Sequence, residues 1–134
     1  MTATYVDANV LVYAFGDLTH PRRAGARAAL ERAAETGPVV TCALTIDEFL
    51  WARRRAAGPE AAVADARALL AAPVLHIVAV ELQHARAAVD NVARYRLRPR
   101  DAFHAAVAQA TRCASILSDD ADFDVVPGLK RVAP

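Results

Sequence analysis

The chain has 134 residues, of which 55% are hydrophobic, and a formal net charge of +1; this length suits one domain, residues 1–134, with a core of its own. No apolar run approaches the roughly 20 residues of a membrane span, and the first residues do not have the pattern of a signal peptide. Since Cys42 and Cys113 stand far apart in apolar surroundings, we expect two reduced core residues and a cytoplasmic protein.

The pattern of apolar residues and breakers predicts strands and helices that alternate along the chain. The expected elements are, in order, strand 4–7, helix 8–15, helix 20–36, strand 39–42, helix 45–57, helix 60–71, strand 74–78, helix 80–95, helix 100–112, strand 115–118 and strand 129–132. Thr45 and Glu48 form the T-x-x-E pattern of a capping box at the start of the third helix. The order predicts an α/β fold, a three-layer domain whose parallel sheet of four to five strands is flanked by helices.

Acidic residues stand where ligands bind in open parallel sheets, beyond the carboxyl ends of the strands. The candidates are Asp7 at the end of the first strand, Glu48 just past the second, Asp101 at the start of the last helix, and Asp119, Asp120 and Asp122 after the fourth strand. Each acid alone has a structural explanation, as a helix cap, a partner of a helix dipole or a member of a solvated turn. We expect the set to converge on one rim of the sheet, because several such roles at the same rim would be a coincidence.

A cluster of carboxylates of this size does not ionise fully without a cation. Oxygen ligands favour a hard divalent ion, Mg²⁺ or Mn²⁺, and no set of histidines and cysteines has the spacing of a zinc site. Such a site suits metal-assisted hydrolysis of a phosphodiester. The sequence has neither G-x-x-x-x-G-K-[ST] nor G-x-G-x-x-G, which argues against a nucleotide-binding domain of the same fold class.

Arginine accounts for fifteen of the sixteen basic residues, and it is clustered. The clusters are Arg22-Arg23, Arg53-Arg54-Arg55, and Arg94, Arg96, Arg98 and Arg100. Because arginine makes planar, bidentate contacts to phosphate, these clusters beside an acidic site predict binding of a polyanion such as RNA. The alternative, that an arginine only solvates a helix face, stays open for each of them.

Four segments together resemble the PIN domain, and in particular the toxins of the VapBC toxin–antitoxin family. They are Val6-Asp7-Ala8-Asn9-Val10-Leu11-Val12, similar to the family's D-x-N-hydrophobic start; Thr45-Ile46-Asp47-Glu48-Phe49-Leu50, with the family's single Glu; Arg100-Asp101-Ala102-Phe103-His104-Ala105-Ala106-Val107-Ala108, similar to D-A-x-H-A-x-x-A; and Ile116-Leu117-Ser118-Asp119-Asp120-Ala121-Asp122-Phe123, similar to a strand that ends in T-x-D-x-D-F. In this order and spacing they cover essentially the whole chain.

The resemblance implies roles for individual residues. It implies that the catalytic, metal-binding acids are Asp7, Glu48, Asp101 and Asp120, with Asp122 as a fifth metal ligand. It also implies that Asn9 orients Asp7 by a hydrogen bond. Ser118 stands where the family has Thr and keeps the hydroxyl. Asp119 beside Asp120 leaves the fourth ligand ambiguous by one position, although strand alternation turns the two side chains apart.

Two further residues have both a functional and a structural interpretation. His104 lies three residues after Asp101 on the same helix face, but a two-metal site does not need a histidine base, so we expect packing or hydrogen bonding within the helix layer. Trp51 has the ring to stack on a base. A lone Trp one turn into an amphipathic helix nevertheless more often belongs to a core or an interface.

The resemblance implies an endoribonuclease that uses Mg²⁺ (or Mn²⁺), leaves a 3′-hydroxyl and a 5′-phosphate, and is the toxin of a type II pair with a cognate antitoxin. Small-residue helix surfaces around 20–36 and 45–70, and the family, also predict a homodimer. The alternative is a catalytically silent PIN-like module that binds RNA or protein; the intact set of acids argues against it. Receiver domains and aspartate-nucleophile phosphatases are excluded, because the residues after Asp7 fit neither pattern.

Overall fold

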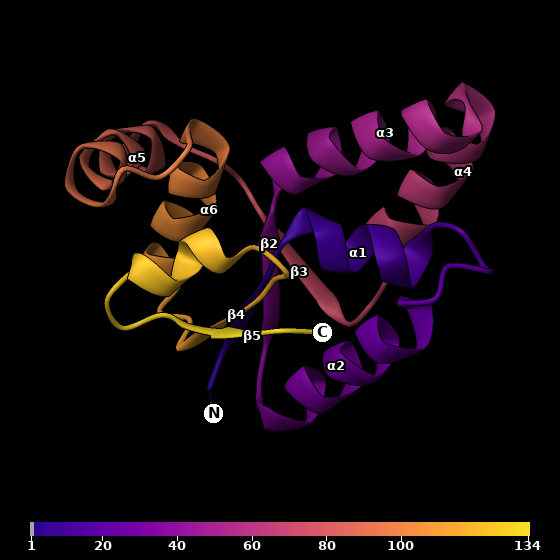
Figure 1. The fold of residues 1–134 in the computed structure, drawn as a ribbon, viewed down its shortest axis with the longest axis horizontal. Helices are drawn as coiled ribbons and strands as arrows, with labels where there is room; N and C mark the ends of the chain where they lie inside the picture. The colour runs from indigo at the N-terminus through magenta and orange to yellow at the C-terminus, as the bar shows by residue number, and fades with distance from the viewer. Residues whose placement is uncertain (1) are drawn as a thin grey trace.

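The computed structural model describes residues 2–134 and has the predicted order of strands and helices (Figure 1). The strands are β1 (Thr4–Val6), β2 (Val39–Cys42), β3 (Leu75–Val78), β4 (Ser115–Leu117) and β5 (Lys130–Val132). The helices are α1 (Ala8–Phe15), α2 (Arg23–Thr36), α3 (Ala43–Ala57), α4 (Pro59–Leu70), α5 (Leu82–Tyr95), α6 (Pro99–Ala110) and the short 3-10 helix η1 (Ala121–Val125). Only η1 has no counterpart among the predicted elements.

All five strands are parallel and lie in the order β3-β2-β1-β4-β5, which confirms the predicted parallel sheet. The chain runs from the central strand β1 to one edge through β2 and β3, and then crosses to the other side for β4 and β5. The direction of winding therefore reverses between β1 and β4, and in sheets of this kind ligands bind at the carboxyl ends of the strands at that point. Asp7 follows β1 directly, and Asp119 and Asp120 come shortly after β4.

Helices cover both faces of the sheet, with α5 and α6 on one side and α1, α2 and α4 on the other (Figure 1). Neighbouring side chains of a strand alternate between the two faces. Tyr5 and Ile116, which are paired in register, pack in the core beside α5 and α6, whereas Val6 and Leu117 pack in the core beside α1 and α2. This alternation gives the three-layer α/β fold that the sequence predicts.

The start of α3 differs from the prediction. The helix begins two residues earlier than expected, directly after β2, and Cys42 occupies the position of its N-cap. Thr45 is buried inside the first turn, where its hydroxyl lies 2.7 Å from that of Thr41. Glu48 contacts His104 instead of the helix terminus. The predicted capping box was wrong, because Thr45 is buried in the interior and Glu48 contacts His104.

The start of α2 also lies later than predicted, at Arg23 rather than near residue 20. Asp17 accepts hydrogen bonds of 2.8 Å from both the amide and the hydroxyl of Thr19, and this local turn delays the helix. Cys42 and Cys113 are buried and free, in agreement with the prediction of reduced core residues. Within residues 2–134, no helix combines the length and the apolar character needed to cross a membrane.

The Arg53-Arg54-Arg55 cluster is not a uniform surface. Arg53 is buried, and its Nε donates to Oδ2 of Asp65 at 3.0 Å, which fastens α3 to α4. Arg54 and Arg55 are exposed, and the guanidinium of Arg55 lies 5.3 Å from the ring centre of Trp51. Arg53 is therefore part of the fold, and only its two neighbours are available to phosphate. Trp51 is 57% exposed and does not belong to the core.

Candidate metal centre and active site

The sequence-predicted acids come from four segments that meet where β1 and β4 end. Asp7 caps α1, Glu48 lies in α3, Asp101 in the first turn of α6, and Asp120 caps η1. An open pocket of about 450 Å³ is lined by Glu48, Arg98, Pro99, Arg100, Asp101 and Asp120. The fold thus brings residues separated by more than a hundred positions to one rim of the sheet, as the spacing of the acids predicts.

The acids form two adjacent groups with the spacing of cation ligands. The first group is Asp7, Glu48 and His104, and the second is Asp101, Asp120 and Asp122. Within each group, one ligand atom from every residue lies within 4.8 Å of the others. The two groups also interact, because the charge of Asp7 helps to raise the pKa of Asp101. The five acids that the resemblance implies therefore lie in two groups whose charges influence each other.

Asp7 is held by three donors. Its Oδ1 accepts from the amide of Ala8 at 2.8 Å and so caps α1, while Oδ2 accepts from Oγ of Ser118 at 2.7 Å and from Nδ2 of Asn9 at 3.2 Å. The predicted hydrogen bond from Asn9 is confirmed. Since these contacts use the backbone of α1 and a hydroxyl after β4, the orientation of the buried carboxylate follows from the fold itself.

Ser118 joins the acid after β1 to the acids after β4. Its fully buried hydroxyl donates to Asp7 and accepts from the amide of Asp120 at 2.9 Å. Nδ2 of Asn9 lies 3.4 Å from the same oxygen. A hydroxyl at this position therefore fixes two metal-ligand candidates at once, which gives a physical reason for the Ser or Thr in the sequence motif.

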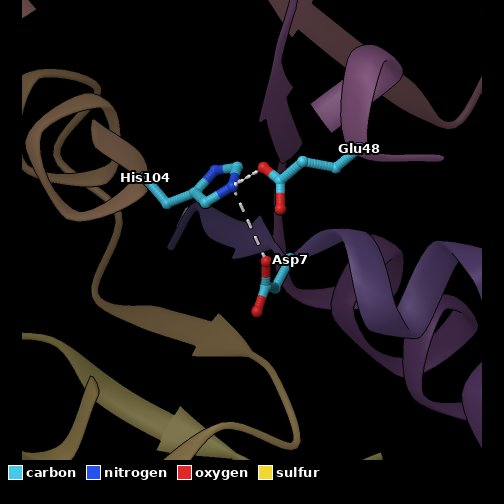
Figure 2. A group of neighbouring side chains, drawn as sticks. All are labelled: Asp7, Glu48 and His104. Carbon is cyan, nitrogen blue, oxygen red and sulfur yellow. Dashed lines mark hydrogen bonds and ion pairs between the residues drawn. The ribbon is translucent and has the colours of Figure 1, made fainter. Parts of the chain in front are cut away.

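The ring of His104 directs Nε2 toward both acids of the first group (Figure 2). Its Nε2 contacts Oε1 of Glu48 and lies 3.8 Å from Oδ1 of Asp7. Nδ1 lies 2.7 Å from the hydroxyl of Tyr5, and that hydroxyl donates to Sγ of Cys42 at 3.1 Å. Both ring nitrogens of His104 therefore have a hydrogen-bond partner, Tyr5 at Nδ1 and Glu48 at Nε2.

Electrostatics agree with a charged imidazole. Burial lowers the pKa of His104, but the hydrogen bonds with Cys42 and Glu48 and the negative charges of Asp7 and Glu48 outweigh it and raise the pKa to about 10. The side chain is completely buried. His104 was expected to pack or hydrogen-bond within the helix layer, but its partners are Tyr5 in β1 and Glu48 in α3, so it belongs to the acidic site.

The carboxylates themselves are difficult to ionise. Burial is the largest cause that raises the pKa of Asp7, and the hydrogen bonds and His104 only partly oppose it. Burial, followed by the charge and hydrogen bond of Asp120, raises the pKa of Asp101 from 3.8 to about 7. The second group of acids therefore holds a surplus of negative charge that a bound cation would neutralise.

The neighbouring acids Asp119 and Asp120 have different surroundings. Oδ2 of Asp119 accepts from the hydroxyl of Tyr13 at 2.7 Å and from the guanidinium of Arg22. Burial raises the pKa of Asp119, but these two donors outweigh it and hold the pKa below its usual value. Asp120 instead lies with Asp101 and Asp122. The geometry thus favours Asp120 over Asp119 as the fourth acid.

Sequence reasoning did not find three features of the site. The contacts of Tyr5 and Cys42 with His104 depend on two strands packing against α6, and no local pattern signals them. The two-sided role of Ser118 is visible only in part, as a hydroxyl in a motif. Arg98 and Arg100 were predicted as members of a cluster, and the structure adds that they stand on the rim of the acidic pocket, where Nε of Arg98 lies 4.0 Å from Asp122.

A family model described as the PIN domain matches residues 4–129. This match covers nearly all of the chain and all five acids of the site. The chain therefore belongs to the PIN domain family, which confirms the resemblance seen in the sequence.

Comparison with individual relatives shows which PIN domain proteins the chain is similar to in sequence. The chain is 35% identical to a VapC ribonuclease of Mycobacterium bovis and to ribonuclease VapC13 of Mycobacterium tuberculosis, in each case over 96% of this chain and 98% of the relative. Within the PIN family the chain thus groups with the VapC ribonucleases.

Solved structures share the fold. VapBC2 from Rickettsia felis, bound to a DNA fragment from its promoter, has a TM-score of 0.76 and 16% identity, covering 98% of each chain. VapC20 of Mycobacterium tuberculosis, described as a toxin that cleaves the sarcin-ricin loop, has a TM-score of 0.74 and 22% identity over 92% of this chain and 95% of its own. At these identities the likeness concerns the three-layer fold.

Proposed function

We propose that the chain is a metal-dependent endoribonuclease whose catalytic acids and metal ligands are Asp7, Glu48, Asp101 and Asp120, with Asp122 as a fifth ligand. The observation that carries this proposal is the convergence of these acids from four segments of the chain at the winding reversal of the sheet. The names of the relatives support the reaction class, since both are called ribonucleases.

The donor set fits a hard divalent cation such as Mg²⁺ or Mn²⁺. The five acids offer only oxygen. Burial lowers the pKa of His104, which is grouped with them, but its contacts with Cys42 and Glu48 and the charge of Asp7 outweigh burial and raise the pKa to about 10. A ring that holds both protons leaves the carboxylates as the ligands for a hard cation. Burial, followed by the charge of Asp120, raises the pKa of Asp101, and a bound cation would counter both effects. A divalent ion held by these acids would lower the pKa of a water molecule and neutralise charge on the phosphate.

Side chains of the protein orient the acids and bind the substrate. The imidazolium of His104 holds Glu48 in one orientation, and Ser118 holds Asp7 and the backbone of Asp120, so the ligands are in place before substrate binds. Arg98 and Arg100 stand exposed on the rim, where they bind the phosphates next to the reacting one. The concave site thus places one phosphodiester against the acids and its neighbours against the arginines.

The alternative of a catalytically silent binding module is disfavoured. Such a module would need no buried, mutually repelling carboxylates, because their ionisation costs stability without a cation. Asp7 is buried, and Asn9, Ser118 and the amide of Ala8 all direct hydrogen bonds to it. A set of donors of this kind supports chemistry at the carboxylate.

We also propose two partners for the chain. One is a cognate antitoxin, which would make the chain the toxin of a type II pair; several structural neighbours are titled as VapBC or toxin–antitoxin complexes. The other is a second copy of the chain. The exposed Trp51 and Val63 line an apolar pocket of about 270 Å³ between α3 and α4, one of the helix surfaces expected to pair. Light scattering of the isolated chain at tens of micromolar tests the dimer, and the mass of one chain would contradict it.

Cleavage of RNA tests the proposed function. The chain, stripped of metal, is incubated with single-stranded RNA in EDTA and after addition of Mg²⁺ or Mn²⁺, next to Asp7→Asn and the exposed control Asp90→Asn. Asn is also a good N-cap, so Asp7→Asn should fold, yet lose cleavage. We expect cutting only with added metal, and only by the wild type and Asp90→Asn. Full cutting in EDTA, or by Asp7→Asn, would contradict the proposal.

A further inference from the structure

A second, apolar pocket adjoins the acidic one. It has a volume of about 440 Å³ and is lined by Ala43, Leu44, Val80, Pro99, Arg100 and Phe103. Pro99 and Arg100 also line the acidic pocket. The first turn of α6 is therefore a shared wall, with the acids on one side and a surface of almost entirely apolar side chains on the other.

Two neighbouring side chains of α6 give this pocket its chemical character. Arg100 and Phe103 are three residues apart and so lie side by side on the helix, as do Asp101 and His104 on the stripe next to them. Phe103 is half-buried and packs with Leu44 against the core, which leaves part of the ring to the pocket. Arg100 is exposed, and none of the salt bridges within residues 2–134 includes it.

A flat ring beside an unpaired guanidinium suits a nucleotide. Bases in single-stranded RNA bind proteins by stacking on aromatic rings and on the guanidinium plane of arginine, while the sugar-phosphate chain follows positive charge. Arg98, two residues before Arg100, extends the positive charge along the same rim toward the acids. Apolar side chains of a protein segment would leave these two guanidinium groups unused, whereas an RNA strand has bases for the apolar pocket and phosphates for the arginines.

We propose that this pocket binds the nucleobase adjacent to the scissile phosphate, with the base stacked on Phe103 and its phosphate held by Arg100. The inference rests on the proposed ribonuclease function and goes beyond it, since it names a subsite. Because the shared wall is a single helical turn, a phosphodiester at the acids and the next base along the strand are within reach of the two pockets together. The pocket then selects unstacked, single-stranded RNA and makes cleavage sensitive to the base at one position.

A double-mutant cycle between protein and RNA tests the subsite. The substrates are single-stranded oligoribonucleotides that the wild-type chain cuts at one position with Mg²⁺, and the same strands with an abasic residue on either side of the cut. The protein variants are Phe103→Leu, which keeps apolar volume but loses the ring, and Phe103→Tyr, which keeps the ring. Arg100→Ala is compared with Arg67→Ala, an exposed arginine on α4. Melting temperature and Mn²⁺ affinity are measured for every variant.

We expect one abasic position and Phe103→Leu each to lower kcat/KM by about tenfold, and their combination to lower it little further, because both remove the same contact. Phe103→Tyr should restore most of the loss, Arg100→Ala should raise KM more than Arg67→Ala does, and Mn²⁺ affinity should not change. Losses that multiply, or a Leu variant equal to the wild type, would overturn the subsite. Loss of a dimer in light scattering with multiplied effects would assign the pocket to a second copy instead. A wild type that cuts no RNA would contradict the proposed function, a result distinct from an active enzyme without base sensitivity.

Discussion

Asp119 and Asp120 are adjacent in sequence, but their carboxylates have different partners. The same substitution at each of the two positions therefore tests which of them belongs to the site. Asp119 is satisfied by Tyr13 and Arg22, whereas Asp120 faces Asp101. We therefore expect Asp120→Asn to abolish cleavage and weaken Mn²⁺ binding. Asp119→Asn should keep both and lose about 0 to 1 kcal/mol of stability, as for a partly exposed ion pair.

Cleavage gels and calorimetric Mn²⁺ titrations of the two variants measure this difference. The substitution is the same at both positions, so each variant is the control for the other. Loss of cleavage at Asp119 with retention at Asp120 would reverse the assignment of the fourth acid.

A second prediction at the residue scale concerns the hydroxyl of Ser118. Ser118→Ala removes a buried donor to Asp7 and an acceptor of the Asp120 amide, and groups left unsatisfied in this way cost about 1 to 3 kcal/mol. We expect the Ala variant to unfold at correspondingly lower denaturant concentration and to bind Mn²⁺ more weakly. Ser118→Thr keeps the hydroxyl and should restore both properties. An Ala variant with wild-type Mn²⁺ affinity would show that this hydroxyl does not position the acids.

At the scale of elements, the first turn of α6 contains Asp101, whose titration makes the unfolding free energy depend on pH. The pKa of Asp101 is about 7 in the folded chain, against an ordinary value of 3.8. Between about pH 4 and pH 7 the native state therefore retains a proton that the unfolded chain has released, so the unfolding free energy of the metal-free protein falls as the pH rises through this range. His104, with its pKa raised to about 10, contributes in the same direction above pH 6.5.

Asp101→Asn isolates the contribution of the carboxyl, because His104 is common to both proteins. Urea unfolding in EDTA at a series of pH values should show a decline in stability between pH 4 and pH 7 that is steeper for the wild type than for the variant. Parallel curves for the two proteins would show that Asp101 is not under electrostatic strain.

The elements also show how far the sequence predicts the molecule. Hydrophobic periodicity and breaker pairs such as Gly37-Pro38 determine the strands, the helices and their order, because these signals are local. The end of α2 at Thr36 agrees with this breaker, whereas its start depends on the turn at Asp17, which competes with the helix through its side chain. The T-x-x-E pattern failed at Thr45 for a tertiary reason, since burial beside Thr41 decides its role.

The sequence predicts which acids form the candidate site, but it does not predict their contacts with other residues. The acids follow from their positions after strands and at helix starts, and the topology brings them together. The contacts of His104 with Tyr5 and Cys42 require β1, β2 and α6 to pack in one core, and the choice between Asp119 and Asp120 requires the position of Arg22 in space. These are long-range contacts that a single sequence does not encode as a local pattern.

For the whole molecule, the net charge is only +1, although acids and arginines are clustered in different places. Arg98 and Arg100 border the acidic pocket, whereas Arg54 and Arg55 lie near the far end of α3. Each phosphate contact contributes about 0.7 to the slope of log affinity against log salt for a single strand. We expect alanine at the first pair to reduce this slope by up to about 1.4 and alanine at the second pair to reduce it less. A slope that changes only with the second pair would place the RNA elsewhere.

The central claim is that the five acids form one cation site, and thermal melting with and without Mn²⁺ tests it most directly. An ion that binds only the native state raises stability by about 2.7 kcal/mol at a hundredfold excess over its dissociation constant. We predict a clear rise in the melting temperature of the wild type. For Asp101→Asn, we predict a metal-free melting temperature at or above that of the wild type and a smaller gain with Mn²⁺. Equal gains in the two proteins, or no gain in the wild type, would contradict the account.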